Sequence, residues 1–408
     1  MTDLSSAAPA GASQLRPRGS NQIGMRQYNE RVVLHAIRLH GNLPKAELAR
    51  LTHLSTQTVS LIVNKLLDDQ LLIKREPLRG RIGQPSIPIA LNPDGAYALG
   101  LKVGRRSAEV ILIDFAGTVR QRWSLDYRYP DPELLVDFVV RCDAALRRSA
   151  GLQDRLDRIQ GLGIAMPFSL GGWQTLLDMP EDVAARWPQT DLRAEIARRI
   201  DWPVMLLKDT AAACTAELVA GRGQSQHSFL YLFVDTFIGG GLVLDSQLHA
   251  GAGGNAGAVA SMPLQRALPG SVAPAQVLSL ASLLTLQTRY EQAGLDAAAA
   301  LDDRALEAPW LDATEAWLDE AAPAIAFAIV HASCLLDLEH VILDGLLGRA
   351  LLQRLLERVE FALNAHNWEG VSRPQLQPGT IGPDASALGG ALLPLHAAFA
   401  PDPGVFLK

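Results

Sequence analysis

Apolar side chains recur at helical intervals through the first seventy residues of the chain. Residues 24–40 carry them at mostly helical spacing and are followed by a glycine, a common residue just past a helix end. Pro44 stands at a favoured first-turn position for a second helix over residues 45–53, and Ser55 is a preferred N-cap for a third over residues 56–70. The pattern predicts three helices, with a short turn between the second and the third.

The second and third of these helices have the spacing of a helix-turn-helix. Ala49 is small enough for two helices to cross there, and Val59 and Ile62 are branched apolar residues that can fix the third helix from beneath. His53 stands in the turn, where glycine is usual. On this packing, polar side chains suited to base edges or phosphate oxygens face outward; they are Ser55, Thr56, Gln57, Thr58, Ser60, Asn64 and Lys65. The alternative is a solvated amphipathic helix in a small bundle.

Residues 71–91 weigh against that alternative. They read as a strand, a basic and glycine-containing tip with Arg79 and Arg81, and a second strand, which is the wing of a winged helix. Arginines on such a hairpin can enter a minor groove. We therefore predict a winged helix-turn-helix over residues 21–91 that binds double-stranded DNA. It follows a disordered tail over residues 1–20, rich in Pro, Ser, Gly and Ala.

After residue 92 the apolar period changes from helix to strand. The order of three successive strands, a helix and two more strands predicts an α/β domain with a mixed sheet over residues 92–408. The first three strands are expected over residues 98–104, 108–115 and 118–127, the helix over 132–149, and the last two strands over 161–168 and 204–210. A second lobe is expected over roughly residues 228–380. There, two strands flank a glycine run and are followed by Ala-rich helices. A last helical segment returns to the first lobe.

Composition excludes several classes of protein. With 408 residues, 48% hydrophobic and 20% charged, the chain can bury cores in more than one lobe. Cys142, Cys214 and Cys334 are far apart and lack metal-ligand spacing, which argues against a disulfide framework and against a cysteine zinc site. The N-terminus lacks a signal-peptide core, and the apolar stretch 321–338 contains Pro323, so we expect a buried helix there, no membrane span and a cytoplasmic protein.

The net charge of −6 conceals a division between the two parts of the chain. Residues 1–91 hold 12 Lys and Arg against 6 Asp and Glu, whereas the remainder holds 25 against 37. Only the N-terminal part is suited to a polyanion. The acidic remainder is better suited to a small ligand or a protein partner.

Several phrases carry a resemblance to a known family, in its order and at its spacing. They are AELARLTHLSTQTVS, GQPSIPIALNPDGAYALGL, LGIAMP, KDTAAACTAEL, IGGGLVLDSQLHAGAGGNAG, LDLEHVILDGLL and IGPDASALGGALLPL. From about residue 22 to its end the chain resembles the ROK family of repressors, open reading frames and kinases. The resemblance implies a two-lobed, actin-like fold of the sugar-kinase or ribonuclease-H type with a sugar cleft between the lobes. Regulators of this family resemble repressors of xylose, glucose and N-acetylglucosamine utilisation genes, are usually dimers or tetramers, and respond to an effector.

The residues that match the kinases' nucleotide contacts depart from the family pattern. The first phosphate loop of the kinases is Asp-x-Gly-Gly-Thr and the second is Gly-Thr-Gly-rich; the matching residues are Lys102, Gly104, Arg105 and Arg106, and then Asp235, Thr236 and Phe237. A lysine replaces the metal-holding acid, and a carboxylate in the second loop would repel phosphate. Residues 341–347 lack the expected glycine cluster at the adenosine end. ATP hydrolysis is therefore not expected.

The sugar contacts are altered as well. The kinases' Asn-Asp pair is Lys208-Asp209 here, and their Glu and His sugar ligands match Ala258 and Ser261, in the same phrase as Asn255. Asp209 is either an acceptor for a ligand hydroxyl or part of a structural ion pair or helix cap. The zinc-binding run of the family matches residues 264–276, which contain no cysteine, so we expect neither metal nor cofactor.

These observations predict a DNA-binding regulator without enzymatic activity. The main hypothesis is a repressor of carbohydrate-utilisation genes, a homodimer or homotetramer, whose cleft binds a sugar-like effector through Lys208, Asp209, Asn255, Ala258 and Ser261. The alternative is a regulator that no longer senses a small molecule and uses the domain for oligomerisation or protein partners. A sugar kinase is the remote third hypothesis.

Overall fold

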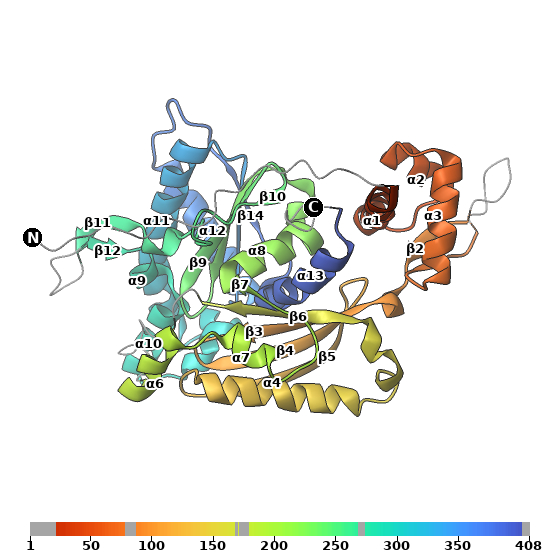
Figure 1. The fold of residues 1–408 in the computed structure, drawn as a ribbon. Helices are drawn as coiled ribbons and strands as arrows, with labels where there is room; N and C mark the ends of the chain where they lie inside the picture. Colours follow the sequence, from red (N-terminus) through yellow and green to blue (C-terminus); the bar gives the residue numbers. More distant parts are fainter. Residues whose placement is uncertain (1–21, 78–86, 168–169, 171–178, 268–273, 402–408) are drawn as a thin grey trace, which may run out of the picture.

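The computed structural model describes residues 22–77, 87–167, 170, 179–267 and 274–401 (Figure 1). The predicted tail and the predicted wing tip with Arg79 and Arg81 lie outside these residues. Three helices and a two-stranded antiparallel hairpin form the N-terminal part: α1 (Gln22–His40), α2 (Lys45–Thr52), α3 (Thr56–Asp68), β1 (Leu72–Lys74) and β2 (Ile89–Leu91).

The turn between α2 and α3 is built on two local features. His53 ends α2 in the left-handed region, with φ 54° and ψ 24°, a conformation that costs an ordinary residue about 1 kcal/mol. Ser55 then caps α3, because its hydroxyl accepts a hydrogen bond from the backbone N–H of Thr58 at 3.1 Å. Val59 and Ile62 are buried as the spacing predicted. His53 thus adopts the conformation for which glycine is usual.

A five-stranded mixed sheet forms the core of the first lobe. Its order is β5-β4-β3-β6-β7; the strands are β3 (Tyr97–Val103), β4 (Ser107–Asp114), β5 (Val119–Asp126), β6 (Ile159–Met166) and β7 (Val204–Lys208). The first three strands are antiparallel, whereas β6 and β7 run parallel to β3. β7 ends at Lys208 and a helix begins at the next residue, so the strand expected over residues 204–210 is two residues shorter.

The second lobe repeats this arrangement. Its sheet has the order β10-β9-β8-β13-β14; the strands are β8 (Phe229–Val234), β9 (Ile238–Leu244), β10 (Gln247–Leu248), β13 (His340–Gly345) and β14 (Gln375–Pro378). Again three antiparallel strands are followed by two parallel ones. Two similar mixed sheets on either side of central helices give the two-lobed, actin-like architecture.

Helices cover both sheets in layers (Figure 1). The outer face of the first sheet packs on α4 (Pro132–Arg147), α6 (Glu181–Arg186) and α7 (Leu192–Ala197). Between the two sheets lie α8 (Asp209–Ala220) and α13 (Ala385–Phe399). The second sheet packs on α9 (Leu278–Ala281), α10 (Leu283–Gln292), α11 (Leu311–Leu336) and α12 (Arg349–Asn364), beside a hairpin of β11 (Pro263–Ala267) and β12 (Pro274–Gln276).

Glycines allow the central helices to approach each other and the first sheet. A Cβ on Gly389 of α13 would lie 1.7 Å from the carbonyl oxygen of Ala212 in α8, and a Cβ on Gly163 of β6 would lie 1.9 Å from the carbonyl oxygen of Gly390. Neither position has room for a methyl group. Backbone-to-backbone packing therefore joins α8, α13 and β6.

The apolar helix α11 belongs to the core of the second lobe. Within the described part of the chain it is the one helix long and apolar enough to cross a membrane. Trp317, Ile325 and Ile329 on its inner face are completely buried in the cluster that includes β8, β13 and α12. This burial agrees with the expectation of a core helix.

Candidate DNA interface and ligand cleft

The outward face of α3 carries the polar residues that were predicted to contact DNA. Thr56, Gln57 and Asn64 are exposed and Ser60 is half-buried, while the opposite face is packed through buried Val59, Ile62, Val63 and Leu66. Leu61 is 67% exposed between Gln57 and Asn64, one turn from each. Leu61 was not among the predicted DNA-contacting residues, although the helical period places it on the polar face. An exposed leucine there can contact a thymine methyl group.

Four of the predicted DNA-contacting residues are engaged within the protein. The hydroxyls of Ser55 and Thr58 hydrogen bond to each other at 2.8 Å at the start of α3. Lys65 pairs with Glu30 of α1, with its Nζ 2.7 Å from a carboxylate oxygen, so it ties α3 to α1. Asn64 accepts a hydrogen bond from Lys45 of α2 at 2.9 Å. These contacts orient the exposed face and leave Gln57 as its central polar group.

The five predicted effector residues line one cavity of about 220 Å³ between the lobes. Lys208 ends β7 and Asp209 begins α8 on the first-lobe side, while the others lie in the loop after β10 and the short helix that follows it; these are Asn255, Ala258 and Ser261. A larger cleft of about 870 Å³ lies next to the cavity, and Pro167 and Lys208 line both. Residues about fifty positions apart thus meet where the resemblance placed a sugar.

Lys208 and Asp209 do not form the ion pair that was one of the alternatives. Lys208 donates a hydrogen bond from Nζ to Oδ1 of Asn255 at 2.7 Å, and Asp209 accepts one from the backbone N–H of Thr210 at 2.7 Å. Burial lowers the pKa of Lys208 and raises the pKa of Asp209; in each case a neighbouring opposite charge opposes the shift. The bond to Thr210 at the start of α8 keeps the helix-cap alternative open, and the Asp209 carboxyl also remains a candidate acceptor for a ligand hydroxyl.

An ion pair joins the two lobes where the kinases' phosphate loops would lie. Lys102 at the end of β3 is 3.6 Å from Asp235, which follows β8, and both side chains are mostly buried. Burial by itself raises the pKa of Asp235, but the charge of Lys102 and the backbone N–H of Thr236 hold that pKa below its ordinary value. The Asp235 carboxylate is therefore ionised, and its charge is paired with a lysine of the opposite lobe.

Arg105 lies against the second lobe as well. Its guanidinium carbon is 4.1 Å from the centre of the Phe237 ring, and its side chain reaches the cavity that contains Asp209. Burial lowers the pKa of Arg105, opposed by the charges of Asp209 and Asp235. The contact of Arg105 with Phe237 fills the approach that a nucleotide phosphate would need at the second phosphate loop.

The remaining family positions are structural here. Asp344, near the expected adenosine end, is completely buried and accepts hydrogen bonds from the backbone N–H of Gly382 at 2.7 Å and from Arg349 at 3.1 Å. The segment that matches the zinc loop forms the β11–β12 hairpin, and its residues 268–273 lie outside the described part. Without cysteine or histidine, residues 264–276 do not fit a zinc ion.

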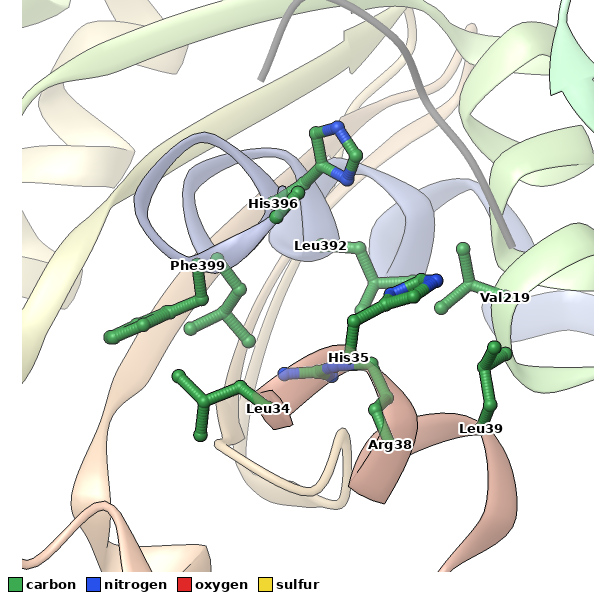
Figure 2. Close-up of a pocket in the computed structure, with 10 residues that line it drawn as sticks. Leu34, His35, Arg38, Leu39, Val219, Leu392, His396 and Phe399 are labelled. Atoms are coloured by element: carbon green, nitrogen blue, oxygen red, sulfur yellow. The ribbon is translucent and has the colours of Figure 1, made fainter. Parts of the chain in front are cut away.

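The N-terminal helices pack directly on the body. Figure 2 shows Leu34, His35, Arg38 and Leu39 of α1 facing α8 and α13 around a small cavity of about 40 Å³, whose other lining residues are Val219, Leu392, Leu395, His396, Phe399 and Ala400. Burial lowers the pKa of Arg38 to about 10, and its guanidinium carbon lies 5.2 Å from the centre of the Phe115 ring. One apolar cluster therefore continues from α1–α3 into α8 and α13.

Comparison with known proteins identifies the family. Residues 98–397, well over half of the chain, match the ROK family. The chain belongs to the ROK family. A xylose repressor of Bacillus spizizenii is 24% identical over 250 residues, which are 60% of this chain and 62% of the repressor. The match thus spans about three fifths of that ROK relative's own length.

Solved ROK structures share the fold. A ROK family transcriptional regulator, a homologue of the Escherichia coli MLC protein, has a TM-score of 0.66 at 19% identity over 93% of this chain and 98% of its own. A ROK hexokinase from Thermus thermophilus has a TM-score of 0.55 at 24% identity over 72% of this chain and 97% of its own. The likeness to the regulator thus covers more of the chain. Because ROK regulators and kinases share the body, the fold alone does not separate these two activities.

Proposed function

We propose that this ROK protein is a sequence-specific DNA-binding transcription regulator, a repressor of carbohydrate-utilisation genes whose cleft binds a sugar-like effector. The relatives named as repressors and regulators support this role. The proposal includes a cytoplasmic homodimer or homotetramer, because two copies of the N-terminal part are needed to read a two-fold symmetric operator.

The N-terminal part fits a winged helix-turn-helix. In this arrangement α3 is the recognition helix, α2 crosses behind it, and β1 and β2 form the base of a wing. Arg79 and Arg81, which the sequence predicts in the wing tip, lie outside the described residues. The exposed polar face of α3 supplies groups that can read base edges, and the basic charge of residues 1–91 supplies affinity for phosphates.

The observation that carries the proposal is the position of α8. Its first residue, Asp209, lines the ligand cavity, and Val219 near its end lines the junction with α1. A helix of 12 residues is about 18 Å long and moves as a rigid body. A ligand that shifts α8 or the lobe around it therefore changes the packing beneath α1. Such a shift would reorient the recognition helices of a dimer.

Operator binding should depend on Gln57. We expect Gln57→Ala to change the preference among operator sequences by about 1–3 kcal/mol at one base pair, because the amide is proposed to contact a base edge.

Arg81→Ala should instead weaken binding to all sequences and flatten the salt dependence, since a groove-inserted arginine acts partly through counterion release. Fluorescence anisotropy with promoter fragments from the protein's own genome, over a salt series, measures both effects.

Two outcomes would contradict this assignment. If Gln57→Ala lowered affinity equally for every sequence, α3 would not be presented to the bases as proposed. If the full-length protein retarded no promoter fragment at low ionic strength, the regulator role itself would be wrong. Glu47→Gln is a suitable control, because Glu47 is paired with Arg50 on α2 and has no proposed base contact.

Phosphoryl transfer is not expected. Asp235 would repel a nucleotide phosphate, and its ion pair with Lys102 links the two loops at 3.6 Å. We predict no ATP turnover above background with any hexose, pentose or N-acetylated hexosamine, measured by coupled release of ADP. Turnover that disappears in Asp209→Asn would instead make the protein a sugar kinase, because Asp209 matches the catalytic base of the kinases.

The alternative regulator, without small-molecule sensing, is favoured by one feature. Ala258 and Ser261 lack the strong polar groups that relatives use for sugars. The cavity nevertheless keeps the charged side chains of Arg105, Lys208 and Asp209, which can still bind a small molecule.

A further inference from the structure

The cavity beside Asp209 contains more positive than negative charge. Among the described residues in and next to it, three cations face two carboxylates; they are Lys102, Arg105, Lys208, Asp209 and Asp235. Lys102 and Asp235 pair with each other, and Lys208 bonds to the neutral amide of Asn255. One carboxylate therefore remains for two cations.

Arg105 is a buried cation with incomplete hydrogen bonding. Its side chain is 9% exposed, and within the described part of the chain its buried Nε has no hydrogen-bond partner. The guanidinium carbon lies over the Phe237 ring, which takes up one side of the group and leaves its N–H groups for hydrogen bonds. It lines the same cavity as Lys208 and Asp209. A buried polar group without a partner is costly, so its retention points to a ligand that completes it.

The chemistry of these groups defines the ligand. A guanidinium presents paired N–H groups that match the two oxygens of a carboxylate or phosphate, and the Lys208 ammonium adds a second positive charge. The carboxylate of Asp209 can accept a hydrogen bond from a hydroxyl group. The cavity of about 220 Å³ is smaller than drug-sized sites of about 300–1,000 Å³, so it suits a monosaccharide-sized molecule.

We infer that this cavity binds an anionic sugar, a monosaccharide that carries a carboxylate or a phosphate group, with the anion on Arg105 and Lys208 and a hydroxyl on Asp209. This inference rests on the proposed function, in which the cleft is the effector site, and it specifies the class of effector. The positive charge takes over the anchoring role that Ala258 and Ser261 cannot perform.

Matched pairs of sugars test the inference on the full-length protein. Isothermal titration calorimetry compares glucuronate with glucose, galacturonate with galactose, and the 6-phosphate of each hexose. At least one anionic probe should bind at least tenfold more tightly than its neutral partner, and Arg105→Met should remove at least tenfold of that affinity. Arg106→Met is the matched control, because Arg106 is exposed next to Arg105, and it should bind like the wild type.

A second measurement separates a binding role from a structural one. Ligand-free Arg105→Met should melt at the same temperature as the wild type or higher, because methionine removes a buried charge that has incomplete hydrogen bonding. Only the wild type and the Arg106 variant should gain stability when the anionic probe is added. A lower melting temperature for ligand-free Arg105→Met would show that Arg105 serves the fold.

The probes also distinguish the sources of the anion. Binding of uronates alone assigns a carboxylate, and binding of hexose 6-phosphates alone assigns a phosphate. Equal affinity for neutral and anionic partners, no binding by any probe, or unchanged binding by Arg105→Met would each overturn the inference. None of these results affects operator binding by the ligand-free protein, so a failure of the regulator role would be seen separately in the DNA-binding assay.

Discussion

Replacing Asp235 by asparagine is expected to lower the free energy of unfolding by about 3 kcal/mol. The side chains of Lys102 and Asp235 are 12% and 14% exposed, so the substitution leaves a mostly buried ammonium without its counterion. It also removes one of the two carboxylates that offset the charge of Arg105. Urea denaturation of the full-length protein, followed by circular dichroism, measures the loss.

A double substitution separates the effect of losing the ion pair from the effect of leaving one charge unpaired. Lys102→Met combined with Asp235→Asn removes the buried charge together with its partner, so we expect it to recover most of the lost stability. Glu47→Gln is the control for an exposed pair. Its partner Arg50 is 68% exposed, and the substitution should have no measurable effect. If Asp235→Asn were as stable as the wild type, Lys102 and Asp235 would not hold the lobes together.

Local patterns were enough to predict the N-terminal elements. The helices α1, α2 and α3 lie where apolar spacing and the cap residue Ser55 placed them, because helices are determined by contacts within a few residues. The turn at His53 shows the limit of this approach. Its left-handed backbone follows from the geometry of the helix crossing, which overrides the local preference of a histidine.

The sequence indicated which residues share the cleft, but it did not indicate which of them contact each other. The resemblance placed Lys208, Asp209 and Asn255 in one site, and they line one cavity. The lysine at position 208, a departure from the family pattern, suggested an ion pair with Asp209, whereas it donates a hydrogen bond to Asn255. The pairing of Lys102 with Asp235 was also missed, since each loop was interpreted alone. A contact between residues on two different sheets depends on how the lobes pack together, and the local spacing of residues in the sequence does not determine that packing.

The buried carboxylate of Glu217 could not have been found from sequence. In α8, Glu217 is completely buried and accepts hydrogen bonds from the backbone N–H groups of Arg222, Thr380 and Ile381. In the sequence it looks like an ordinary surface residue of an Ala-rich helix, because an acidic side chain is almost never fully buried unless it is paired. Two of these partners, Thr380 and Ile381, are more than 160 residues away in the chain, so only the fold reveals that Glu217 fixes the segment before α13.

The largest loss of stability is expected from Gly389→Ala. Alanine favours a helix over glycine by about 1 kcal/mol, so propensity alone predicts a more stable α13. Packing predicts the opposite, because the new Cβ would lie 1.7 Å from the carbonyl oxygen of Ala212, whereas such atoms need roughly 3.5 Å. Because that atom belongs to the α8 backbone, the helices must separate, and the cost should exceed about 4 kcal/mol.

A graded series of alanine variants tests this crossing by melting temperature and limited proteolysis. Gly253→Ala has no atom within 4 Å of its new Cβ and should be neutral, whereas Gly390→Ala, at 2.9 Å from the carbonyl oxygen of Gly163, should be intermediate. Separation of α13 from α8 also disturbs Leu392 and Phe399, which line the junction with α1. Gly389→Ala should therefore expose α1 to protease at temperatures where the other two variants protect it. Equal stability of all three variants would show that α8 and α13 do not cross through these glycines.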